Sequence, residues 1–236
     1  MTAKNSMNTL QVPRSIGVIL DGNRRWAKER MLPPLAGHKA GYDKVKEVLA
    51  WAVEAGITFV TLYVFSTENW NRPENEVQYL LGLIRLLERD VKEFKQKGYR
   101  LHIIGDRTRL PHDIQELIAR VEDETSLGTA LAVACALSYG GQDEIVAAVN
   151  QLLVDKDRVA GPVTKEELRT YMWSKNIPFP DLIVRTGGDH RLSNFLTWQS
   201  AYSELFFVEE LWPAFSRASF DKVLNDFATR NRRFGK

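Results

Sequence analysis

Short apolar runs alternate along the chain with longer stretches in which apolar residues recur every three or four positions. The runs have the length and composition of buried parallel strands, and the periodic stretches are typical of amphipathic helices. The predicted strands are residues 16–20, 59–65, 101–104, 131–137, 182–184 and 205–208. The alternation predicts an α/β fold, in which a single domain has a central, mostly parallel six-stranded sheet flanked by helices.

Helical periodicity fills the intervals between the predicted strands. The predicted helices include residues 45–52, with a stop at Gly56, and then residues 76–97, 114–124, 144–154, 164–173 and 220–229. Residues 76–97 form the longest of them, with an apolar face that runs from Val77 to Val91. Thr164 and Glu167 have the spacing of a capping box at a helix start.

Length and composition narrow the class of protein. The chain of 236 residues carries a formal net charge of only +2, which gives no reason to expect a nucleic-acid partner. Residues 1–15 lack the apolar core of a signal peptide and are expected to form a flexible arm before a domain at residues 16–236. The lone Cys135 excludes an internal disulfide, fits a reducing compartment, and is expected to be a small buried hydrophobe. No segment approaches the roughly 20 apolar residues of a membrane span, so we expect a cytoplasmic protein with at most peripheral membrane contact.

Polar clusters follow five of the predicted strands directly. They are residues 21–23, 66–72, 105–106, 138–141 and 185–191. Ligands of open parallel sheets bind at the carboxyl ends of the strands. Polar turns at strand ends would explain each cluster alone, but less well their shared richness in Arg, Asn and Ser. We therefore predict one composite site at that edge.

The first cluster joins a buried strand to a cationic helix. Asp21 could cap the helix by accepting backbone N–H bonds, which its position alone favours, or it could hold Mg²⁺ beside phosphate oxygens. Gly22 and Asn23 allow close backbone approach to an anion, and Arg24 and Arg25 add charge. Basic helix surfaces are common, so the cations alone are a weak signal.

Two further clusters could bind phosphate. Arg72 precedes Pro73 at a helix start, where it could fork onto a phosphate or pair with Glu74 or Glu76 on the surface. In the last cluster, the double glycine Gly187–Gly188 lies between two arginines, and a serine follows two residues after the second arginine. These three residues, which could form a second phosphate clamp, are Arg185, Arg191 and Ser193.

Other chemistries lack their signatures. The sequence has no Walker motif, no dinucleotide-binding glycine fingerprint, no zinc-ligand spacing and no nucleophile elbow. Glu204, at the edge of an apolar run, is expected to be either paired or bound to metal. Two cationic anion sites with carboxylates and no covalent nucleophile indicate group transfer between diphosphates.

Ordered blocks over nearly the whole chain resemble the cis-prenyltransferases, most closely the bacterial undecaprenyl diphosphate synthases. In chain order the blocks read DGNRRWAK, GHKAG, TLYVFSTENWNRP, HIIGD, YGG, DLIVRTGGDHRLSNFLTWQ, AYSELFF and LWPAF. The resemblance implies a hydrophobic tunnel in the fold and Mg²⁺ as cofactor. It also implies condensation of isopentenyl diphosphate onto an allylic diphosphate, typically farnesyl diphosphate, to give a Z-polyprenyl diphosphate.

The resemblance assigns roles to individual residues. Asp21, Asn23 and Ser66 would be catalytic, and Asp21 and Glu204 would hold the metal. The substrate-binding residues would be Gly22, Arg24, Arg25, Trp26, His38, Glu68, Asn69, Trp70, Arg72, Arg185, Arg191 and Ser193. The resemblance further implies a homodimer in which Arg233 and Gly235 reach the phosphate site of the partner subunit, and peripheral membrane contact for product release.

Two positions depart from the family pattern. Pro34 stands where the family usually has an arginine that contacts the allylic diphosphate, so weaker allylic binding or an altered starter preference is expected. Asp189 replaces a common glutamate and keeps the carboxylate. The main alternative is a short- or medium-chain synthase, since Val64 is larger than the alanine of some long-chain relatives. A non-catalytic subunit of a heteromeric enzyme and a generic phosphate-binding hydrolase are the remaining alternatives.

Overall fold

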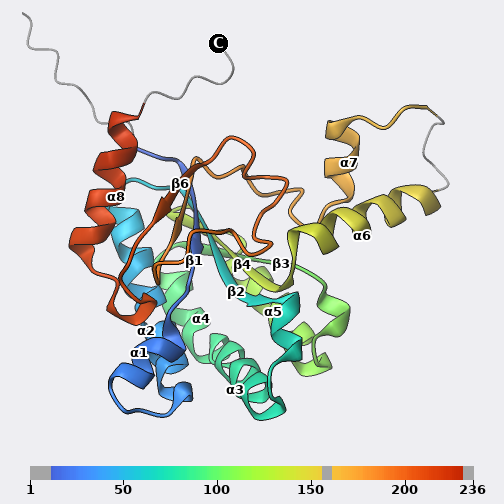
Figure 1. Cartoon of the computed structure of the whole chain (residues 1–236). Helices are drawn as coiled ribbons and strands as arrows, with labels where there is room; N and C mark the ends of the chain where they lie inside the picture. Colours follow the sequence, from blue (N-terminus) through green and yellow to red (C-terminus); the bar gives the residue numbers. More distant parts are fainter. Residues whose placement is uncertain (1–11, 156–160, 231–236) are drawn as a thin grey trace, which may run out of the picture.

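The computed structural model describes residues 12–155 and 161–230, and its centre is a six-stranded sheet (Figure 1). The strands are β1 (Ser15–Ile19), β2 (Phe59–Ser66), β3 (Tyr99–Ile104), β4 (Leu131–Tyr139), β5 (Leu182–Arg185) and β6 (Glu204–Phe207). They lie in the order β3-β4-β2-β1-β5-β6, and every pairing between neighbours is parallel. The predicted α/β fold is confirmed, and all six strands fall where the apolar runs predict them.

Helices and irregular segments cover the two faces of the sheet. The α-helices are α1 (Asn23–Glu29), α2 (Pro34–Glu54), α3 (Glu74–Arg85), α4 (Leu87–Gln96), α5 (His112–Thr125), α6 (Gly141–Val154), α7 (Lys165–Tyr171) and α8 (Arg217–Thr229). Short 3₁₀ helices are η1 (Thr67–Asn71), η2 (Arg107–Arg109) and η3 (Trp212–Ala214). One face packs against α2 to α5 and α8, whereas the other packs against residues such as Ile177, Phe195 and Leu196.

The predicted single helix over residues 76–97 is wrong, because Leu86 separates α3 from α4 (Figure 1). The Leu86 N–H bonds to the Leu83 carbonyl at 3.1 Å, instead of reaching the Gly82 carbonyl one residue further back. Gly82 lies one turn before this break, and a glycine inside a helix weakens it by roughly 0.5–1 kcal/mol relative to alanine. The apolar periodicity on both sides of Leu86 conceals the break.

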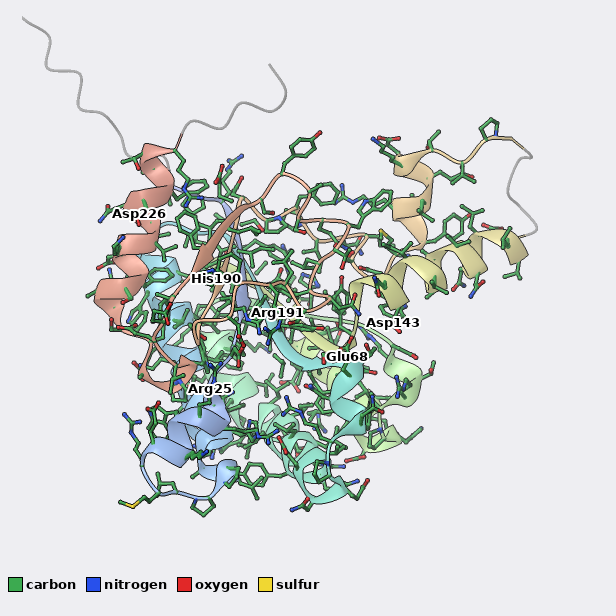
Figure 2. The ribbon with its side chains drawn as sticks, in the orientation of Figure 1. Arg25, Glu68, Asp143, His190, Arg191 and Asp226 are labelled. Atoms are coloured by element: carbon green, nitrogen blue, oxygen red, sulfur yellow. The ribbon has the colours of Figure 1, made fainter. Side chains whose placement is uncertain are left out.

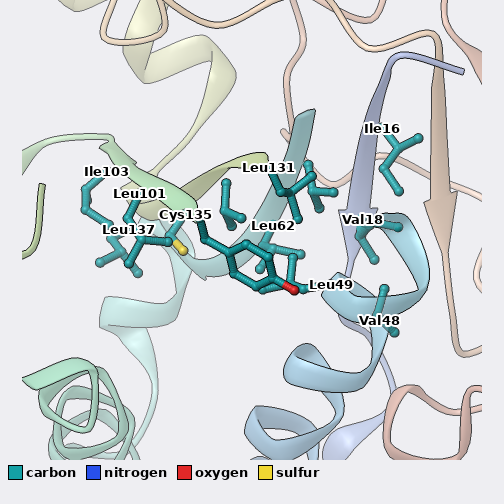
Figure 3. Packing of buried hydrophobic residues seen from close by; sticks show 14 of the residues in the cluster. Ile16, Val18, Val48, Leu49, Leu62, Leu101, Ile103, Leu131, Cys135 and Leu137 are labelled. Carbon is teal, nitrogen blue, oxygen red and sulfur yellow. The ribbon is translucent and has the colours of Figure 1, made fainter. Parts of the chain in front are cut away.

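The main core lies between the sheet and α2, where strand side chains such as Val18 and Leu62 lie near Val48 and Leu49 (Figure 3). Cys135 of β4 is buried in this core, as predicted, and burial raises the pKa of its thiol to about 12. Among the residues that the structure describes, no helix is long and apolar enough to cross a bilayer.

Parallel pairing brings the polar clusters to one edge. Ile19 is in register with both Tyr63 and Arg185, so Asp21 lies just beyond β1 while Arg185 ends β5 beside it. Ser66 ends β2 on the other side of β1. Segments that are more than 100 residues apart in the sequence, at 21 and 185, thereby face one another.

Candidate active site

Asp21 and Arg185 form the centre of the site. Arg185 Nη2 donates to Asp21 Oδ2 at 2.8 Å, and Arg25 Nη2 lies 3.2 Å from Asp21 Oδ1. The other terminal nitrogen of Arg25, Nη1, donates to the Gly187 carbonyl at 2.6 Å and fixes the position of the guanidinium group. The Asp21 carboxylate is thus held between two guanidinium groups, one from α1 and one from the end of β5.

The surroundings keep Asp21 ionised. Partial burial raises the pKa of its carboxyl, but hydrogen bonds and charge from Arg185 and Arg25 outweigh burial and leave the pKa below its ordinary value. The alternative that Asp21 caps α1 is wrong, because Gly22 is the N-cap residue and no side chain caps the helix. Gly22 adopts a φ of 109°, and a Cβ there would lie 2.9 Å from Leu211, so only glycine fits this turn.

The segment after β5 supplies the predicted second clamp. Arg185 Nη1 donates to Ser193 Oγ at 2.8 Å and to the Arg191 carbonyl at 2.5 Å. Arg191 Nη2 donates to Asp189 Oδ2 at 2.9 Å, and Arg185 Nη2 lies 3.5 Å from the same oxygen. Arg185 Nε is buried and has no hydrogen-bond partner among the described residues. Arg185, Arg191 and Ser193 are therefore brought together with Asp21, and Arg185 links them.

Asn23 carries an unsatisfied acceptor. Its Nδ2 donates to the Leu20 carbonyl at 3.3 Å, whereas its Oδ1 is buried without a partner among the described residues. A Cβ on Gly41 of α2 would lie 2.2 Å from that oxygen, so a glycine is needed for α2 to pass this close. Buried acceptors are seldom left unpaired, and a ligand group can supply the missing donor.

The turn after β2 is tied to the rest of the site. Ser66 and Asn69 form a capping box around η1, with the Ser66 N–H donating to Asn69 Oδ1 at 3.1 Å. Trp70 Nε1 donates to Ser138 Oγ at 3.0 Å, and its ring packs edge-on against Phe65. The predicted loop residues Asn69 and Trp70 thus hold the turn in shape from within.

Glu76 draws three predicted residues into a second ionic group. His38 Nε2 lies 3.1 Å from Glu76 Oε1, Arg72 Nη1 lies 2.8 Å from the same oxygen, and Arg24 Nη1 lies 3.9 Å from Oε2. The alternative that Arg72 pairs with a glutamate is confirmed for Glu76, but Glu76 is buried and the pair does not lie on the surface as expected. Burial and the Arg72 charge lower the pKa of His38 despite its bond to Glu76, which keeps the imidazole neutral. The sequence signal for Glu76 was only its spacing of four from Arg72.

Asn194 is a site residue that sequence reasoning missed. Its Nδ2 donates to Glu68 Oε1 at 3.1 Å and to Asp143 Oδ2 at 3.3 Å, while its Oδ1 accepts from the Gln142 N–H at 2.8 Å. It follows Ser193 directly, so it connects the second clamp with η1 and with the start of α6. Figure 2 labels two of its neighbours, Glu68 and Asp143. Bonds from Asn194, Ser66, Thr67 and the Glu68 backbone outweigh burial and lower the pKa of Glu68.

A cavity of about 1230 Å³ begins at this polar edge and extends between the sheet and the helices α2 to α4. Its polar lining includes Asp21, Asn23, Arg25, Arg185 and Ser193. Its apolar lining comprises Val45, Leu49, Leu62, Val64, Phe65, Leu80, Leu83, Ile84, Leu87, Phe94, Leu101, Val133, Cys135 and Leu137. One continuous space therefore joins cationic anion-binding groups to a long apolar wall.

Some predicted residues lie outside this arrangement. Glu204 begins β6 in register with Leu182, which is level with Ile16, so it lies about five residues, or roughly 15 Å, before Asp21 along the strand direction. Its carboxylate accepts from Arg230 Nη1 at 2.6 Å. Trp26 packs under the Arg30 guanidinium at 4.4 Å. Arg233, Gly235 and residues 1–11 of the predicted arm lie outside the described residues.

The donor set at Asp21 suits a hard divalent cation. Asp21 and Asp189 both contact Arg185, and in the described part of the chain no three His, Cys, Asp or Glu side chains gather around one metal position. Mg²⁺ is usually bound by one or two carboxylates together with waters and substrate phosphates, not by a cage of protein ligands. The residues present therefore fit Mg²⁺ bound together with a phosphate ligand.

Comparisons with known proteins agree over almost the whole chain. Residues 19–235 match the family model described as "Putative undecaprenyl diphosphate synthase". The ditrans,polycis-undecaprenyl-diphosphate synthase ((2E,6E)-farnesyl-diphosphate specific) of Pseudomonas aeruginosa is 44% identical over 95% of this chain and 91% of its own. A probable undecaprenyl diphosphate synthase from Campylobacter jejuni superposes with a TM-score of 0.80 at 32% identity, over 96% of this chain and 100% of its own. Lavandulyl diphosphate synthase from Lavandula x intermedia, solved with dimethylallyl diphosphate, superposes with a TM-score of 0.90 at 30% identity, over 95% and 99%.

Proposed function

The chain belongs to the undecaprenyl diphosphate synthase family of prenyltransferases, and from that premise we propose that it elongates an allylic diphosphate with isopentenyl diphosphate in cis. The observation that carries the proposal is the continuity of the cavity with the cluster of Asp21, Arg25, Arg185 and Ser193 at its polar end. A diphosphate held at that end would place its isoprenoid chain against the apolar wall.

In the proposed reaction the allylic carbon–oxygen bond breaks and diphosphate leaves with the bonding electrons. The double bond of isopentenyl diphosphate attacks the allylic carbon to form the new carbon–carbon bond. A proton is then lost from the isopentenyl unit to an oxygen of the diphosphate, and its electron pair forms the Z double bond. The product is again an allylic diphosphate, so the cycle can repeat.

The two cationic groups have separate tasks in this scheme. Arg25 and the backbone at Gly22 and Asn23 would bind the allylic diphosphate, where charge grows as the bond breaks. Arg185, Arg191 and Ser193 would bind isopentenyl diphosphate. Arg185 is the physical link, because it contacts both Asp21 and Ser193.

Asp21 and Asp189 would hold Mg²⁺ together with diphosphate oxygens, and the metal when bound neutralises charge on the leaving group. The low pKa of Asp21 keeps a carboxylate ready for this role. Because Glu204 lies far along the sheet from Asp21, it would not share a metal ion with Asp21 of the same subunit. We propose that the protein is a homodimer, in which a metal role for Glu204 would involve the second subunit.

The amide of Asn23 and the hydroxyl of Ser66 would orient the reacting groups. An amide is not a base at neutral pH, so Asn23 would help to orient the reacting groups rather than remove the proton. His38 and Arg24 line the cavity and both contact Glu76, which would hold their side chains in place beside the substrate.

The size of the apolar space favours a long product. Pockets for small ligands usually span roughly 300–1,000 Å³, and this cavity holds about 1230 Å³. The Pseudomonas aeruginosa relative is named as farnesyl-diphosphate specific, which supports farnesyl diphosphate as the starter. A short-chain product remains the second candidate, favoured by the TM-score of 0.90 to lavandulyl diphosphate synthase.

Product analysis tests the proposal. Purified protein is incubated with Mg²⁺, labelled isopentenyl diphosphate and, separately, dimethylallyl, geranyl, farnesyl or geranylgeranyl diphosphate, and the dephosphorylated products are sized. A long polyprenol from farnesyl diphosphate is expected. A short product would contradict undecaprenyl-type elongation and support the second candidate. If a folded protein incorporates no isopentenyl diphosphate with any starter, both candidates are refuted.

A further inference from the structure

The turn that carries the clamp hydroxyl has an unusual backbone. Residues 193–196 form this turn, here named the Ser193 turn, and Ser193, Asn194 and Leu196 have φ values of 48°, 65° and 47°. These values lie in the left-handed region, which asparagine tolerates but serine and leucine do not favour. The surrounding structure therefore has to hold the Ser193 turn in this shape.

Tyr63 of β2 contacts the Ser193 turn at two places. Its Oη lies 3.2 Å from the Ser193 carbonyl oxygen and 3.2 Å from the Tyr139 carbonyl oxygen at the end of β4. Burial and the charge of Glu68 raise the pKa of the Tyr63 phenol, so at neutral pH the hydroxyl keeps the proton that it donates. The Tyr63 ring stacks on the ring of Phe195, with centroids 4.7 Å apart and an interplanar angle of 21°. Because Phe195 is fully buried, this stacking fixes the direction of the Tyr63 hydroxyl.

Two strands hold Ser193 from opposite sides of β1. β1 lies between β2 and β5, and Ile19 is in register with both Tyr63 and Arg185. From β5, Arg185 Nη1 donates to the Ser193 hydroxyl at 2.8 Å. From β2, the Tyr63 hydroxyl donates to the Ser193 carbonyl. The orientation of the Ser193 hydroxyl thus depends on both strands.

The other bonds to the Ser193 turn reach Asn194. The Gly141 N–H donates to the Asn194 carbonyl at 2.7 Å, and the next N–H of α6 donates to Asn194 Oδ1 at 2.8 Å. In the part of the chain that the structure describes, the Tyr63 hydroxyl is the only group that bonds to the Ser193 backbone. The loss of this hydroxyl would therefore free the backbone of Ser193 while Asn194 stays attached to α6.

We infer that Tyr63 is a positioning residue of the second clamp. Its hydroxyl holds the Ser193 carbonyl, which keeps the Ser193 hydroxyl directed toward Arg185, where a diphosphate would bind. Tyr63 also lines the cavity together with these two residues, so a direct contact with substrate is the role to be distinguished. The inference rests on the proposed function for the identity of the ligand, isopentenyl diphosphate, but binding of this ligand can be measured without turnover.

The test is a double-mutant cycle on the full chain, measured by calorimetric titration with isopentenyl diphosphate in the absence of an allylic substrate. Tyr63→Phe keeps the stacked ring and removes only the hydroxyl. It should weaken binding about three- to tenfold, as expected for the loss of one neutral hydrogen bond. Ser193→Ala should also weaken binding. Adding Tyr63→Phe to Ser193→Ala should have no further effect, because the hydroxyl that Tyr63 positions is then absent.

Tyr99→Phe is the matched control. Tyr99 is buried on β3, and its hydroxyl has no hydrogen bond with the described residues, so this substitution should leave the affinity for isopentenyl diphosphate unchanged. Steady-state assays at saturating allylic substrate give a second readout. Tyr63→Phe should raise the KM for isopentenyl diphosphate by the same factor as the loss of binding, while kcat changes by less than about twofold. A merely structural loss would lower Tm without this selective change in KM.

Two results would overturn the positioning role. The first is binding of isopentenyl diphosphate by Tyr63→Phe as tight as by wild type, even if Tm falls. The second is additive losses in the double variant, which would identify Tyr63 as a direct substrate contact. An active enzyme with unchanged affinity in Tyr63→Phe refutes the positioning alone. Binding that Tyr63→Phe weakens, without product from any starter, refutes the proposed reaction alone, and no binding by folded wild type refutes both.

Discussion

Asn194 offers a quantitative test of how the site is held together. Its side chain bonds to Glu68, Asp143 and the Gln142 N–H, and two of these three partners are carboxylates; the Thr197 hydroxyl adds a longer contact of 3.5 Å. These contacts are partly exposed, so each contributes about 0.5–1 kcal/mol, near the low end of measured values. The loss of all three is expected to lower the free energy of unfolding by roughly 2 kcal/mol.

The backbone of Asn194 separates two contributions. Its φ is 65°, which asparagine and glycine adopt readily and alanine does not. Asn194→Gly should therefore lose only the side-chain bonds, whereas Asn194→Ala should lose a further ~1 kcal/mol from backbone strain. For a chain of this size ~1 kcal/mol shifts Tm by about 2–4 °C, so scanning calorimetry resolves the two variants.

The same substitutions should affect one substrate selectively. Asn194 is adjacent to Ser193 of the second clamp, so either variant should raise the KM for isopentenyl diphosphate more than the KM for the allylic substrate. Asn150, which is exposed on α6, provides the matched control: Asn150→Ala should leave both KM values and Tm nearly unchanged. Equal Tm values for Asn194→Ala and Asn194→Gly, with an unaltered isopentenyl KM, would refute the reasoning.

Three further predictions concern charge. In Arg185→Lys, the single ammonium group cannot bond to both Asp21 and Ser193 as the planar guanidinium does. The kcat/KM for isopentenyl diphosphate should therefore fall about 10- to 100-fold in steady-state assays, and a change below threefold would contradict the role of Arg185 as the link between these two residues. Interactions with Arg89, Lys46 and Tyr42 outweigh burial and lower the pKa of the Asp90 carboxyl from 3.8 to about 2. The ionised carboxylate therefore stabilises the fold fully above pH 4, and this stabilisation is lost as the pH falls through 2. Asp90→Asn should thus lower the free energy of unfolding by about 2 kcal/mol at pH 7. In urea unfolding at a series of pH values, this free energy should fall less on acidification than it does in wild type, and an equal fall would exclude Asp90 as the cause. Pro34→Arg should lower the allylic KM by about tenfold, since an added charged hydrogen bond contributes ~1.5 kcal/mol or more, and an unchanged KM would show that other cations already supply it.

The strands and their common edge were predictable because of how parallel sheets are buried. Strands covered on both faces need continuous apolar runs, and the register of parallel strands puts every polar residue that follows a run at one edge. Asp21, Arg185 and Ser193 could therefore be grouped without any knowledge of distances. The break at Leu86 escaped prediction because apolar periodicity continues across it and only the backbone bond pattern reveals it.

Partners that are distant in sequence could not be read from the chain. Asn194 and Glu68 are 126 residues apart, and His38 and Glu76 are 38 residues apart. Nothing in the local composition of either segment indicates that these side chains meet, because the meeting depends on strand order and on loop paths. For the same reason the position of Glu204, level with Ile16 and not with Asp21, follows only from the register of β5 and β6.

Sequence by itself determined the strands, the functional edge and the family, since these depend on local periodicity and on residues adjacent to strand ends. Tertiary structure alone decided which charges pair, how far the apolar cavity extends and which apolar side chains, such as Met31, remain exposed to water. The physical reason is that periodicity reports whether a side chain is buried, whereas the partner that it meets is chosen by the packing of segments far apart in the chain.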